Sequence, residues 1–188
     1  MIKSEKNSRE QAKIAVRRAL PEHDWINWTI YHGEREKAQP NAELGLTAEL
    51  VNKEFQNPTA KFLGRTIRQW SKMIADDSGQ QAIFNAFTDE SELPIGIARA
   101  GFTDDGDPIL SHIYVDHRAR GRGAGSALVR AGQEWHGGKE VKLRVAEYNL
   151  DAQQFYKGLG FVASQEVRPG YMVGNILVPQ VEMVHPGV

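Results

Sequence analysis

The sequence lacks several features that would define a class of protein. None of its 188 residues is cysteine, which excludes disulfide bonds, thiolate metal sites and a cysteine nucleophile. No apolar run approaches the roughly 20 residues that cross a bilayer. The first residues, MIKSEKNSREQ, are polar and lack the apolar segment of a secretory signal. We therefore expect a cytoplasmic protein that does not insert into membranes.

An excess of either charge is also lacking. The formal net charge of −1 provides no overall attraction to nucleic acid or to anionic membranes, so any basic function must be local. None of the six histidines pairs with another at i, i+4 around an acidic residue. We therefore expect no metal site. The length and the 40% hydrophobic content predict one globular domain over 13–188, after a flexible polar tail at 1–12.

The hydrophobic periodicity predicts an α/β protein with a mixed sheet. Short apolar or alternating runs indicate strands, and the last two of these should form a hairpin around Pro169-Gly170. Capping residues and an apolar repeat at helical spacing indicate helices, the first of which should end near Gly33. The expected strands are 14–20, 81–88, 94–102, 109–115, 141–146, 161–167 and 171–184, and the expected helices are 24–33, 48–55, 59–76, 123–136 and 151–159.

The most informative segment is Arg120-Gly121-Arg122-Gly123-Ala124-Gly125, between the expected strand 109–115 and the helix that follows. Its three glycines carry no side chain, so backbone N–H groups can converge on an anion. The N-terminus of the next helix directs its positive dipole end to the same place. Arginines within the turn add full charge and paired donors. This arrangement predicts a phosphate or pyrophosphate site.

Two common nucleotide motifs do not fit this turn. A dinucleotide fingerprint counted from Gly121 or Gly123 requires glycine where Ser126 or Leu128 stands. A Walker A loop requires Gly-Lys-Ser/Thr, which is absent. The remaining pattern is Arg/Gln-x-x-Gly-x-Gly/Ala, which Arg120, Gly123 and Gly125 match.

On these residues the chain resembles the GCN5-related N-acetyltransferase (GNAT) family. The segment Val115–Leu128 is similar to that family's acetyl-CoA signature, and Asn149-x-x-Ala152-x-x-Phe155-Tyr156-x-x-x-Gly160-Phe161 is similar to its later helix motif. The resemblance covers roughly residues 80–165. It implies a GNAT-like fold, in which a mixed, mostly antiparallel sheet is flanked by helices and splayed at the acetyl-CoA site. It also implies direct acetyl transfer from acetyl-CoA to a primary amine in a ternary complex.

The resemblance assigns donor-binding roles to residues of both motifs. The backbone amides of the turn should hold the pyrophosphate, with the Arg120 and Arg122 side chains beside them. A backbone N–H of Tyr114 or Val115 should polarise the thioester carbonyl. Asn149 should cap a helix and also contact the coenzyme arm. The full set expected to bind the coenzyme is Tyr114, Val115, Arg120, Gly121, Arg122, Gly123, Ala124, Gly125, Ser126, Asn149 and Phe155.

The resemblance defines the catalytic residues less clearly than the residues that bind the donor. Tyr156 matches the family's general acid for the leaving thiolate, although the apolar stripe on its helix also suits a packing role. Ser111 stands where several relatives have a glutamate base. The base is then His112, Glu147 or a water chain. On a regular strand only one of Ser111 and His112 faces the substrate, and a bulge would reverse the choice.

The acceptor is less defined than the donor. Trp25, Trp28 and Tyr31 either line an acceptor site or pack in the core. We expect a small-molecule amine, with a peptide or protein amine as an alternative, and a homodimer, as relatives often are. Three rival interpretations remain: a catalytically silent acyl-CoA-binding module, an enzyme for a longer acyl-CoA, and a nucleic-acid binder using the local arginines. The net charge disfavours the last of these, and we expect no nucleic-acid partner.

Overall fold

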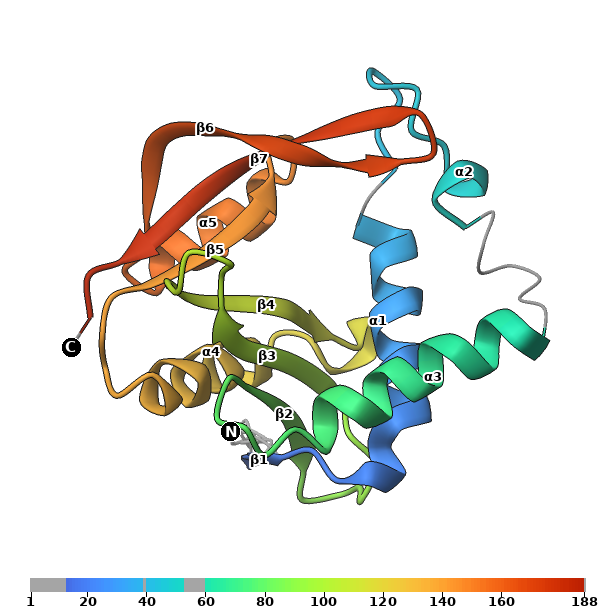
Figure 1. The fold of residues 1–188 in the computed structure, drawn as a ribbon, viewed down its shortest axis with the longest axis vertical. Coiled ribbons are helices and arrows are strands. Elements are labelled where there is room, and N and C mark those ends of the chain that lie inside the picture. The colour runs from blue at the N-terminus through green and yellow to red at the C-terminus, as the bar shows by residue number, and fades with distance from the viewer. Residues whose placement is uncertain (1–12, 39, 53–59, 188) are drawn as a thin grey trace, which may run out of the picture.

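A seven-stranded sheet forms the centre of the protein (Figure 1). The computed structural model describes residues 13–38, 40–52 and 60–187, so the tail expected at 1–12 lies outside the described residues. The strand order is β1-β2-β3-β4-β5-β7-β6, and only the neighbours β4 and β5 run parallel. The mixed, mostly antiparallel sheet expected from the sequence is therefore confirmed. The strands are β1 (Ile14–Arg18), β2 (Gln81–Thr88), β3 (Gly96–Phe102), β4 (Pro108–Val115), β5 (Val141–Ala146), β6 (Val162–Val173) and β7 (Ile176–His185).

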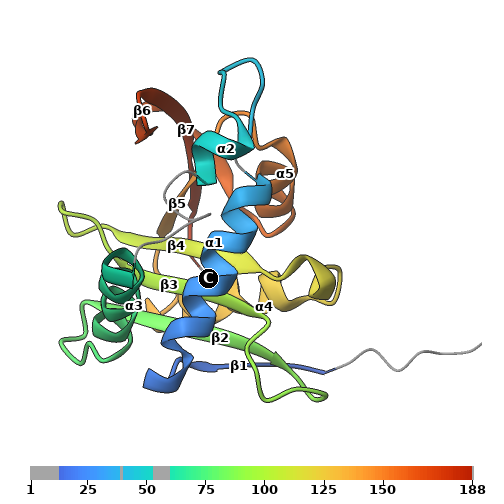
Figure 2. The same cartoon turned by 90° about the vertical axis from the view of Figure 1, so that its right-hand side faces the viewer.

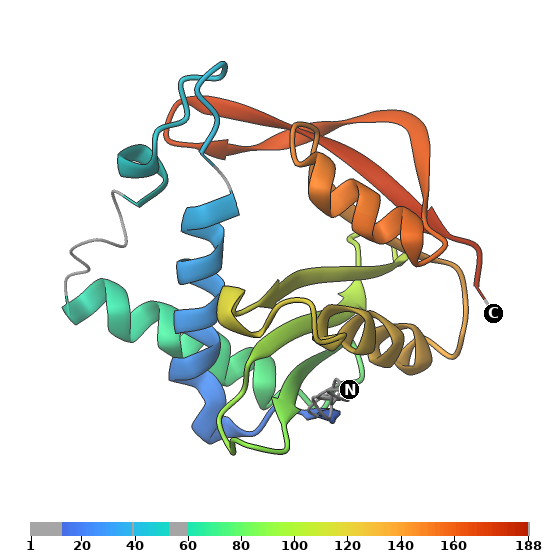
Figure 3. The ribbon, with the colours of Figure 1, turned by 180° about the vertical axis from the view of Figure 1, so that it is seen from behind.

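Helices cover both faces of this sheet (Figures 2 and 3). One core cluster joins α1 and α3 to one face through Ile30, Trp70 and Ile97. A second cluster joins α4 and α5 to the opposite face through Leu128 and Tyr156. The helices are α1 (Asp24–Ala38), α2 (Ala48–Asn52), α3 (Ala60–Ile74), α4 (Ala124–Trp135) and α5 (Leu150–Gly158), with short 3₁₀ turns η1 (Pro21–His23) and η2 (His117–Ala119). None of the helices in the described ranges is both long and apolar enough to cross a bilayer.

Helix α1 is longer than predicted. It continues through Gly33 to Ala38 instead of ending near the glycine. Residues 34–38 (Glu-Arg-Glu-Lys-Ala) are all good helix formers, and a helical glycine costs only about 1 kcal/mol. The additional turn brings Glu34 and Arg35 into regular helical positions, where both become important for the site.

A buried polar pair fixes α1 on the sheet. Asn85 Nδ2 of β2 donates a hydrogen bond to Asn27 Oδ1 of α1 over 2.6 Å, and a second to the Gly96 carbonyl over 3.2 Å. Both asparagine side chains are fully buried, where an amide hydrogen bond discriminates strongly between alternative packings. Tyr31, one helical turn further along α1, is thereby held above β4.

The expected position of the C-terminal hairpin turn is wrong. The turn is at Gly174-Asn175, with Gly174 in the left-handed region at φ 59°, as two-residue hairpin turns require. Pro169-Gly170 lies inside β6, next to a register shift between Arg168 and Tyr171. Proline and glycine in a strand commonly mark such an irregularity, and the sequence signal was therefore a bulge and not a turn.

Strands β4 and β5 separate after a very short contact. They pair only at Ile109–Lys142 and Leu110–Leu143. Beyond Leu110 the side of β4 that faces β5 has no strand partner, so backbone groups there are available to a ligand. Close packing of α4 supports the paired end, because a Cβ on Gly132 would lie 2.5 Å from Leu110 Cδ2. This divergence is the splay that the family resemblance implies.

Candidate active site

The splay between β4 and β5 contains a cavity of about 480 Å³. Its walls are the facing residues 109–114 of β4 and 143–146 of β5. Four other elements also line it, with Tyr31 and Arg35 from α1, Tyr156 from α5, Tyr171 from β6 and Gln180 from β7. Residues far apart in the sequence therefore converge on the one place where the sheet is open.

A bulge in β4 shapes the floor of this cavity. Ile97 pairs with Tyr114 but Arg99 pairs with Ser111, so β4 carries one extra residue between these pairs. His112 occupies the bulge at φ 53°, and no other non-glycine residue in the described ranges has a positive φ. Both Ser111 and His112 consequently line the cavity, which resolves the choice that a regular strand would impose.

His112 lies in a largely aromatic environment. Its ring centroid is 5.1 Å from that of Tyr31 and 5.7 Å from that of Trp70, and its Nδ1 is 3.1 Å from Ser111 Oγ. Burial, reinforced by the charges of Arg99 and Arg35, lowers the pKa of His112 to about 4. The imidazole is therefore neutral near pH 7, and it is a weak base.

Tyr156 combines the two roles that the sequence left open. Its ring packs against Phe155 and Phe161, with centroids 5.1 and 5.8 Å away, and the residue also lines the cavity. Desolvation raises the pKa of the Tyr156 phenol above its usual value. The hydroxyl therefore stays protonated near neutral pH and can act as a proton donor.

The other two polar candidates beyond β5 differ in position. Asn149 lines the cavity, and its Oδ1 accepts a hydrogen bond of 3.1 Å from the Ala152 N–H, which confirms the expected helix cap. Glu147 is exposed and is not one of the lining residues. Its backbone N–H donates a hydrogen bond to the Pro179 carbonyl, and its carbonyl accepts one from the Gln153 side-chain amide.

The glycine-rich turn precedes α4 directly. Gly121 and Gly123 have φ values of 76° and 85°, a conformation that glycine adopts without steric cost. Helix α4 begins at Ala124, so the amides of residues 124–126 belong to its first turn and have no acceptor within the helix. Within the described chain, none of the backbone amides of residues 121–126 donates a hydrogen bond to a protein acceptor. Phe155 covers this turn, since a Cβ on Gly125 would lie 3.1 Å from its ring.

The arginines around the turn each lie beside a carboxylate. Arg120 Nη2 is 2.6 Å from Glu34 Oε2, and Arg118 Nη2 is 2.6 Å from Asp116 Oδ2. Arg122 Nη1 lies 3.9 Å from the exposed Glu90. The backbone amides, and not the guanidinium groups, are therefore the uncommitted donors of the turn.

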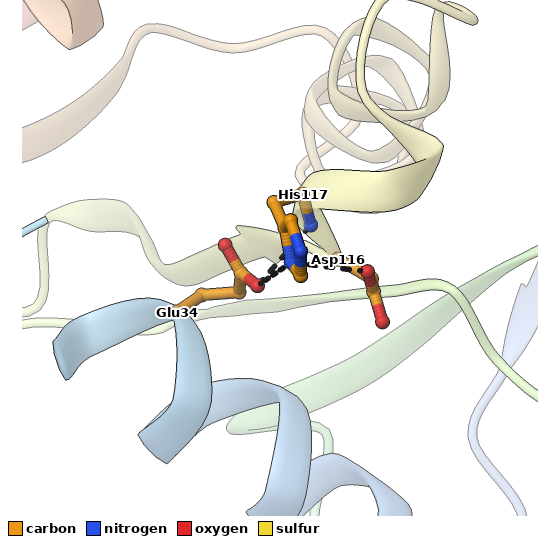
Figure 4. A group of neighbouring side chains, drawn as sticks. All are labelled: Glu34, Asp116 and His117. Carbon is orange, nitrogen blue, oxygen red and sulfur yellow. Dashed lines mark hydrogen bonds and ion pairs between the residues drawn. The ribbon is translucent and has the colours of Figure 1, made fainter. Parts of the chain in front are cut away.

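Glu34 of α1 is the centre of an ion-pair cluster with the start of η2 (Figure 4). Its side chain is only 4% exposed, and Oε1 accepts a 3.1 Å hydrogen bond from the His117 N–H. Oε1 also lies 3.2 Å from both His117 Nδ1 and Lys37 Nζ. Burial opposes ionisation of Glu34, but these hydrogen bonds and the charge of Arg120 outweigh it and lower the pKa of the carboxyl. The cluster ties α1 to the segment that leads into the glycine-rich turn.

The same cluster includes three groups that could bind a metal ion. Donor atoms of Glu34, Asp116 and His117 lie within 4.8 Å of one another. Two cations, Lys37 and Arg120, already neutralise Glu34, which makes a further cation unfavourable there. We therefore interpret the cluster as structural.

The comparison with known families agrees with this geometry. A family model described as "Acetyltransferase (GNAT) family" matches residues 46–161, more than half of the chain. The chain belongs to the GNAT acetyltransferase family. The match spans both the glycine-rich turn and the later helix motif.

Solved structures show the same fold at low sequence identity. An acetyltransferase from Thermus thermophilus is 19% identical with a TM-score of 0.63, over 94% of this chain and 98% of that one. A chimera of the spermidine N-acetyltransferase SpeG from Vibrio cholerae and hSSAT is 13% identical with a TM-score of 0.64, over 93% and 96%. A GNAT acetyltransferase from Streptococcus pneumoniae is 18% identical with a TM-score of 0.61, over 92% and 98%. No curated protein sequence matches the chain.

Three residues of this GNAT site were not found by sequence reasoning. Glu34 and Arg35 follow the glycine at which the first helix was expected to end, and Tyr171 follows the expected hairpin turn. Arg35 and Tyr171 line the cavity and Glu34 contacts the segment before the turn, and no short motif carries that information. Of the early aromatics, Tyr31 lines the cavity, Trp28 packs against the α1–α3 core and Trp25 is exposed.

Proposed function

We propose that this GNAT acetyltransferase transfers an acetyl group from acetyl-CoA to the primary amine of a small molecule, by direct attack in a ternary complex. One observation carries the proposal: the splay between β4 and β5 contains a cavity lined by the protonated Tyr156, and the adjacent Phe155 contacts a turn with uncommitted amides. These are the two features that a thioester with a distant pyrophosphate requires. The absence of cysteine removes the most direct covalent alternative.

The residues of the turn supply the donor site in this proposal. The amides of Gly121, Arg122, Gly123, Ala124, Gly125 and Ser126 converge with the dipole of α4 on the pyrophosphate. Phe155 shields one side of the turn. Arg120 contributes by fixing the turn to Glu34, while the exposed Arg122 supplies charge from the solvent side.

The cavity residues supply the chemistry. The Val115 amide polarises the thioester carbonyl from the unpaired side of β4, whereas Tyr114 pairs with Ile97 and directs its backbone groups to β3. The amine nitrogen forms a bond to the carbonyl carbon, the carbon–sulfur bond breaks, and Tyr156 donates its phenolic proton to the departing sulfur. The phenolate then regains a proton from solvent.

The amine must also lose a proton, and His112 is placed to accept a hydrogen bond from it. Its pKa of about 4 makes it a poor final acceptor for a proton from an amine. We therefore propose that His112 orients the amine and that water carries the proton away. Glu147 could serve only from outside the cavity.

Release of coenzyme A from acetyl-CoA in the presence of a panel of primary amines tests this function. Tyr156→Phe should lower kcat by about 100-fold or more, within the range that general acids contribute. It should change Tm little, because the phenyl ring keeps its contacts with Phe155 and Phe161. Full kcat in this variant would assign Tyr156 a packing role only.

The same assay separates the two alternative functions. A silent module would bind coenzyme A and turn over with no amine in the panel. An enzyme for a longer acyl group would show a higher kcat/KM with propionyl- or butyryl-CoA than with acetyl-CoA.

A further inference from the structure

One wall of the cavity is formed largely by aromatic rings. Tyr31 of α1, Tyr114 of β4 and Tyr171 of β6 line it, and together they are named the tyrosine wall. The rings of Tyr31 and Tyr114 are nearly perpendicular, with centroids 5.2 Å apart, and the ring of His112 lies 5.1 Å from that of Tyr31. Tyr156 lines the cavity as well, so four of the five tyrosines in the sequence meet at this site. Aromatic linings of this kind are typical of pockets that bind small molecules.

The tyrosine wall lies on the side of the sheet opposite to the proposed donor site. The glycine-rich turn leads into α4, which packs on one face of the sheet, whereas α1 and α3 pack on the other (Figures 2 and 3). Because the bulge in β4 adds one residue, His112 and Tyr114 both contact Tyr31 of α1. An acceptor that approaches from the α1 side therefore passes along these rings to reach the thioester.

Neighbouring groups hold the tyrosine wall in place and keep it uncharged. The Tyr31 ring packs edge-on against the buried Trp70, with centroids 5.8 Å apart. The Arg35 guanidinium carbon lies 5.8 Å from the centroid of the Tyr31 ring and 5.8 Å from that of Tyr171. Burial, together with the Tyr31 phenol, raises the pKa of Tyr114 above its ordinary value, so this phenol is neutral at pH 7. A ligand therefore meets ordered, neutral ring surfaces, which lowers the entropic cost of binding.

Carboxylates are missing from the described lining of the cavity. Within the described chain, the lining residues include no aspartate and no glutamate. Burying an ammonium group without a carboxylate partner is costly. The amine that is acetylated loses its proton before it reacts, but a second ammonium group, as in a polyamine, would keep its charge. The lining therefore favours a monoamine over a polyamine.

We infer that the acceptor is a monoamine in which one or two carbons join the amino group to an aromatic ring, and that this ring packs against Tyr31 and Tyr114. The inference rests on the amine acetylation proposed above and names the substrate class of that site. The rings of His112 and Tyr114 lie 5.1 and 5.2 Å from that of Tyr31, so an amine held at His112 requires only a short linker to a ring at the tyrosine wall. Edge-to-face and offset contacts between aromatic rings add about 3- to 10-fold in affinity beyond the area that they bury.

Matched pairs of amines test the inference directly. The full-length enzyme with acetyl-CoA is assayed with 2-phenylethylamine and 2-cyclohexylethylamine, with benzylamine and cyclohexylmethylamine, and with spermidine. Each saturated amine keeps the carbon skeleton of its aromatic partner but has no π-system. In the better pair, we expect a kcat/KM about 3- to 10-fold higher for the aromatic amine than for the saturated one, and at least about 10-fold higher than for spermidine. Equal values within both pairs, or a preference for spermidine, would overturn the inference.

Variants of Tyr31 locate the ring site. Tyr31→Leu keeps an apolar side chain but removes the ring, so it should reduce the ratio within the pair to near 1, chiefly through the KM of the amine. Tyr31→Phe should keep the ratio. The matched control is Trp25→Leu, because Trp25 is an exposed aromatic residue of the same helix, and it should also keep the ratio. Tyr114→Leu repeats the test from β4 if Tyr31→Leu does not fold. An unchanged ratio in both leucine variants of the tyrosine wall would contradict the proposed ring site.

A binding measurement separates this inference from the proposed function. Isothermal titration of the same amines into the enzyme saturated with coenzyme A should show tighter binding of the aromatic member, and Tyr31→Leu should remove the difference. If this holds while no amine is acetylated, acetyl transfer is wrong and the aromatic site stands. If amines are acetylated with no preference for a ring, the proposed function stands and the aromatic site is wrong. Failure of every amine to bind would also remove the aromatic site.

Discussion

At the scale of single residues, His112 shows how one backbone irregularity determines a chemical property. The bulge in β4 rotates this side chain into the aromatic wall of the cavity, and its positive φ is one that histidine tolerates better than most residues. Burial there holds the pKa of the folded imidazole at about 4, against about 6.5 in an unfolded chain. Between these two pH values the unfolded chain binds more protons, so stability must fall as the pH is lowered from 6.5 to 4.

His112→Asn tests this linkage, because asparagine tolerates a positive φ and does not titrate. Between pH 7 and pH 4.5 the wild type should lose about 2 kcal/mol more unfolding free energy than the variant. Burial also lowers the pKa of His32 to about 4, and His32 is present in both proteins. The loss of unfolding free energy at low pH should therefore be smaller in the variant, but not absent. Urea titrations at the two pH values measure the difference. Equal losses in the two proteins would mean that His112 is not desolvated.

A related prediction concerns the pH dependence of catalysis. Because the pKa of His112 is about 4, its titration should produce no inflection in kcat/KM between pH 5 and 8. The acid limb should instead move with the pKa of the amine substrate, and it should persist in His112→Asn. A limb near pH 6.5 that disappears in this variant would show that His112 is the base.

At the scale of secondary-structure elements, the end of α1 contributes both to the cavity and to the ion-pair cluster that precedes the glycine-rich turn. Its last turns carry Glu34, which holds the segment before the glycine-rich turn, and Arg35, which enters the cavity. The two side chains diverge because adjacent helical residues point about 100° apart. A change in the position of α1 would therefore disturb both sites together.

Glu34→Gln should loosen this connection. Glutamine keeps the shape but removes the charge that Arg120 and Lys37 contact, at a cost of about 1–3 kcal/mol in unfolding free energy. The KM for acetyl-CoA should rise by about 10-fold, because the contacts that hold the segment before the turn on α1 are weakened. Glu90→Gln is the matched control on the exposed side of the turn, and it should change stability by less than about 1 kcal/mol. An equal effect of the two variants on KM would remove Glu34 from the donor site.

Element boundaries also separate what the sequence could predict from what it could not. The glycine-rich turn, the Asn149 cap and the order of helices and strands along the chain follow from local rules, and the structure has them where expected. Local rules do not predict the extra turn of α1 or the position of the last hairpin turn at Gly174. The same glycine or proline can mark a bulge, a turn or a tolerated position inside a helix or strand. Arg35, Glu34 and Tyr171 were missed for this reason. Their roles depend on contacts across the fold, which a single sequence does not reveal.

At the scale of the whole molecule, the sheet consists of two halves that are joined weakly. Strands β1–β4 with α1, α3 and α4 form one half, and β5–β7 with α5 form the other (Figure 3). Only two residue pairs connect β4 to β5 in the sheet. A ligand that fills the splay would contact both halves, so its binding should stabilise the junction more than the outer strands.

Coenzyme A should therefore change local stability unevenly. At a concentration 100 times its Kd it should add about 2.7 kcal/mol of unfolding free energy, which raises Tm by roughly 5–10 °C. Amide hydrogen exchange should slow most in β4, β5 and the first turn of α4, and least in β1. Uniform slowing across the sheet would mean that the ligand does not bind at the junction.

Two glycine variants make this test specific for the glycine-rich turn. Gly123→Asp places a negative charge where the pyrophosphate is expected, and it should abolish the rise in Tm. Gly106→Asp is the control, because Gly106 has nearly the same backbone conformation, with φ 84° against 85°, and equally open surroundings. It lies at the opposite end of β4 and should retain the full rise. Since both variants carry the same steric cost, a loss confined to Gly123→Asp isolates the charge effect, whereas an equal loss in both would place the coenzyme elsewhere.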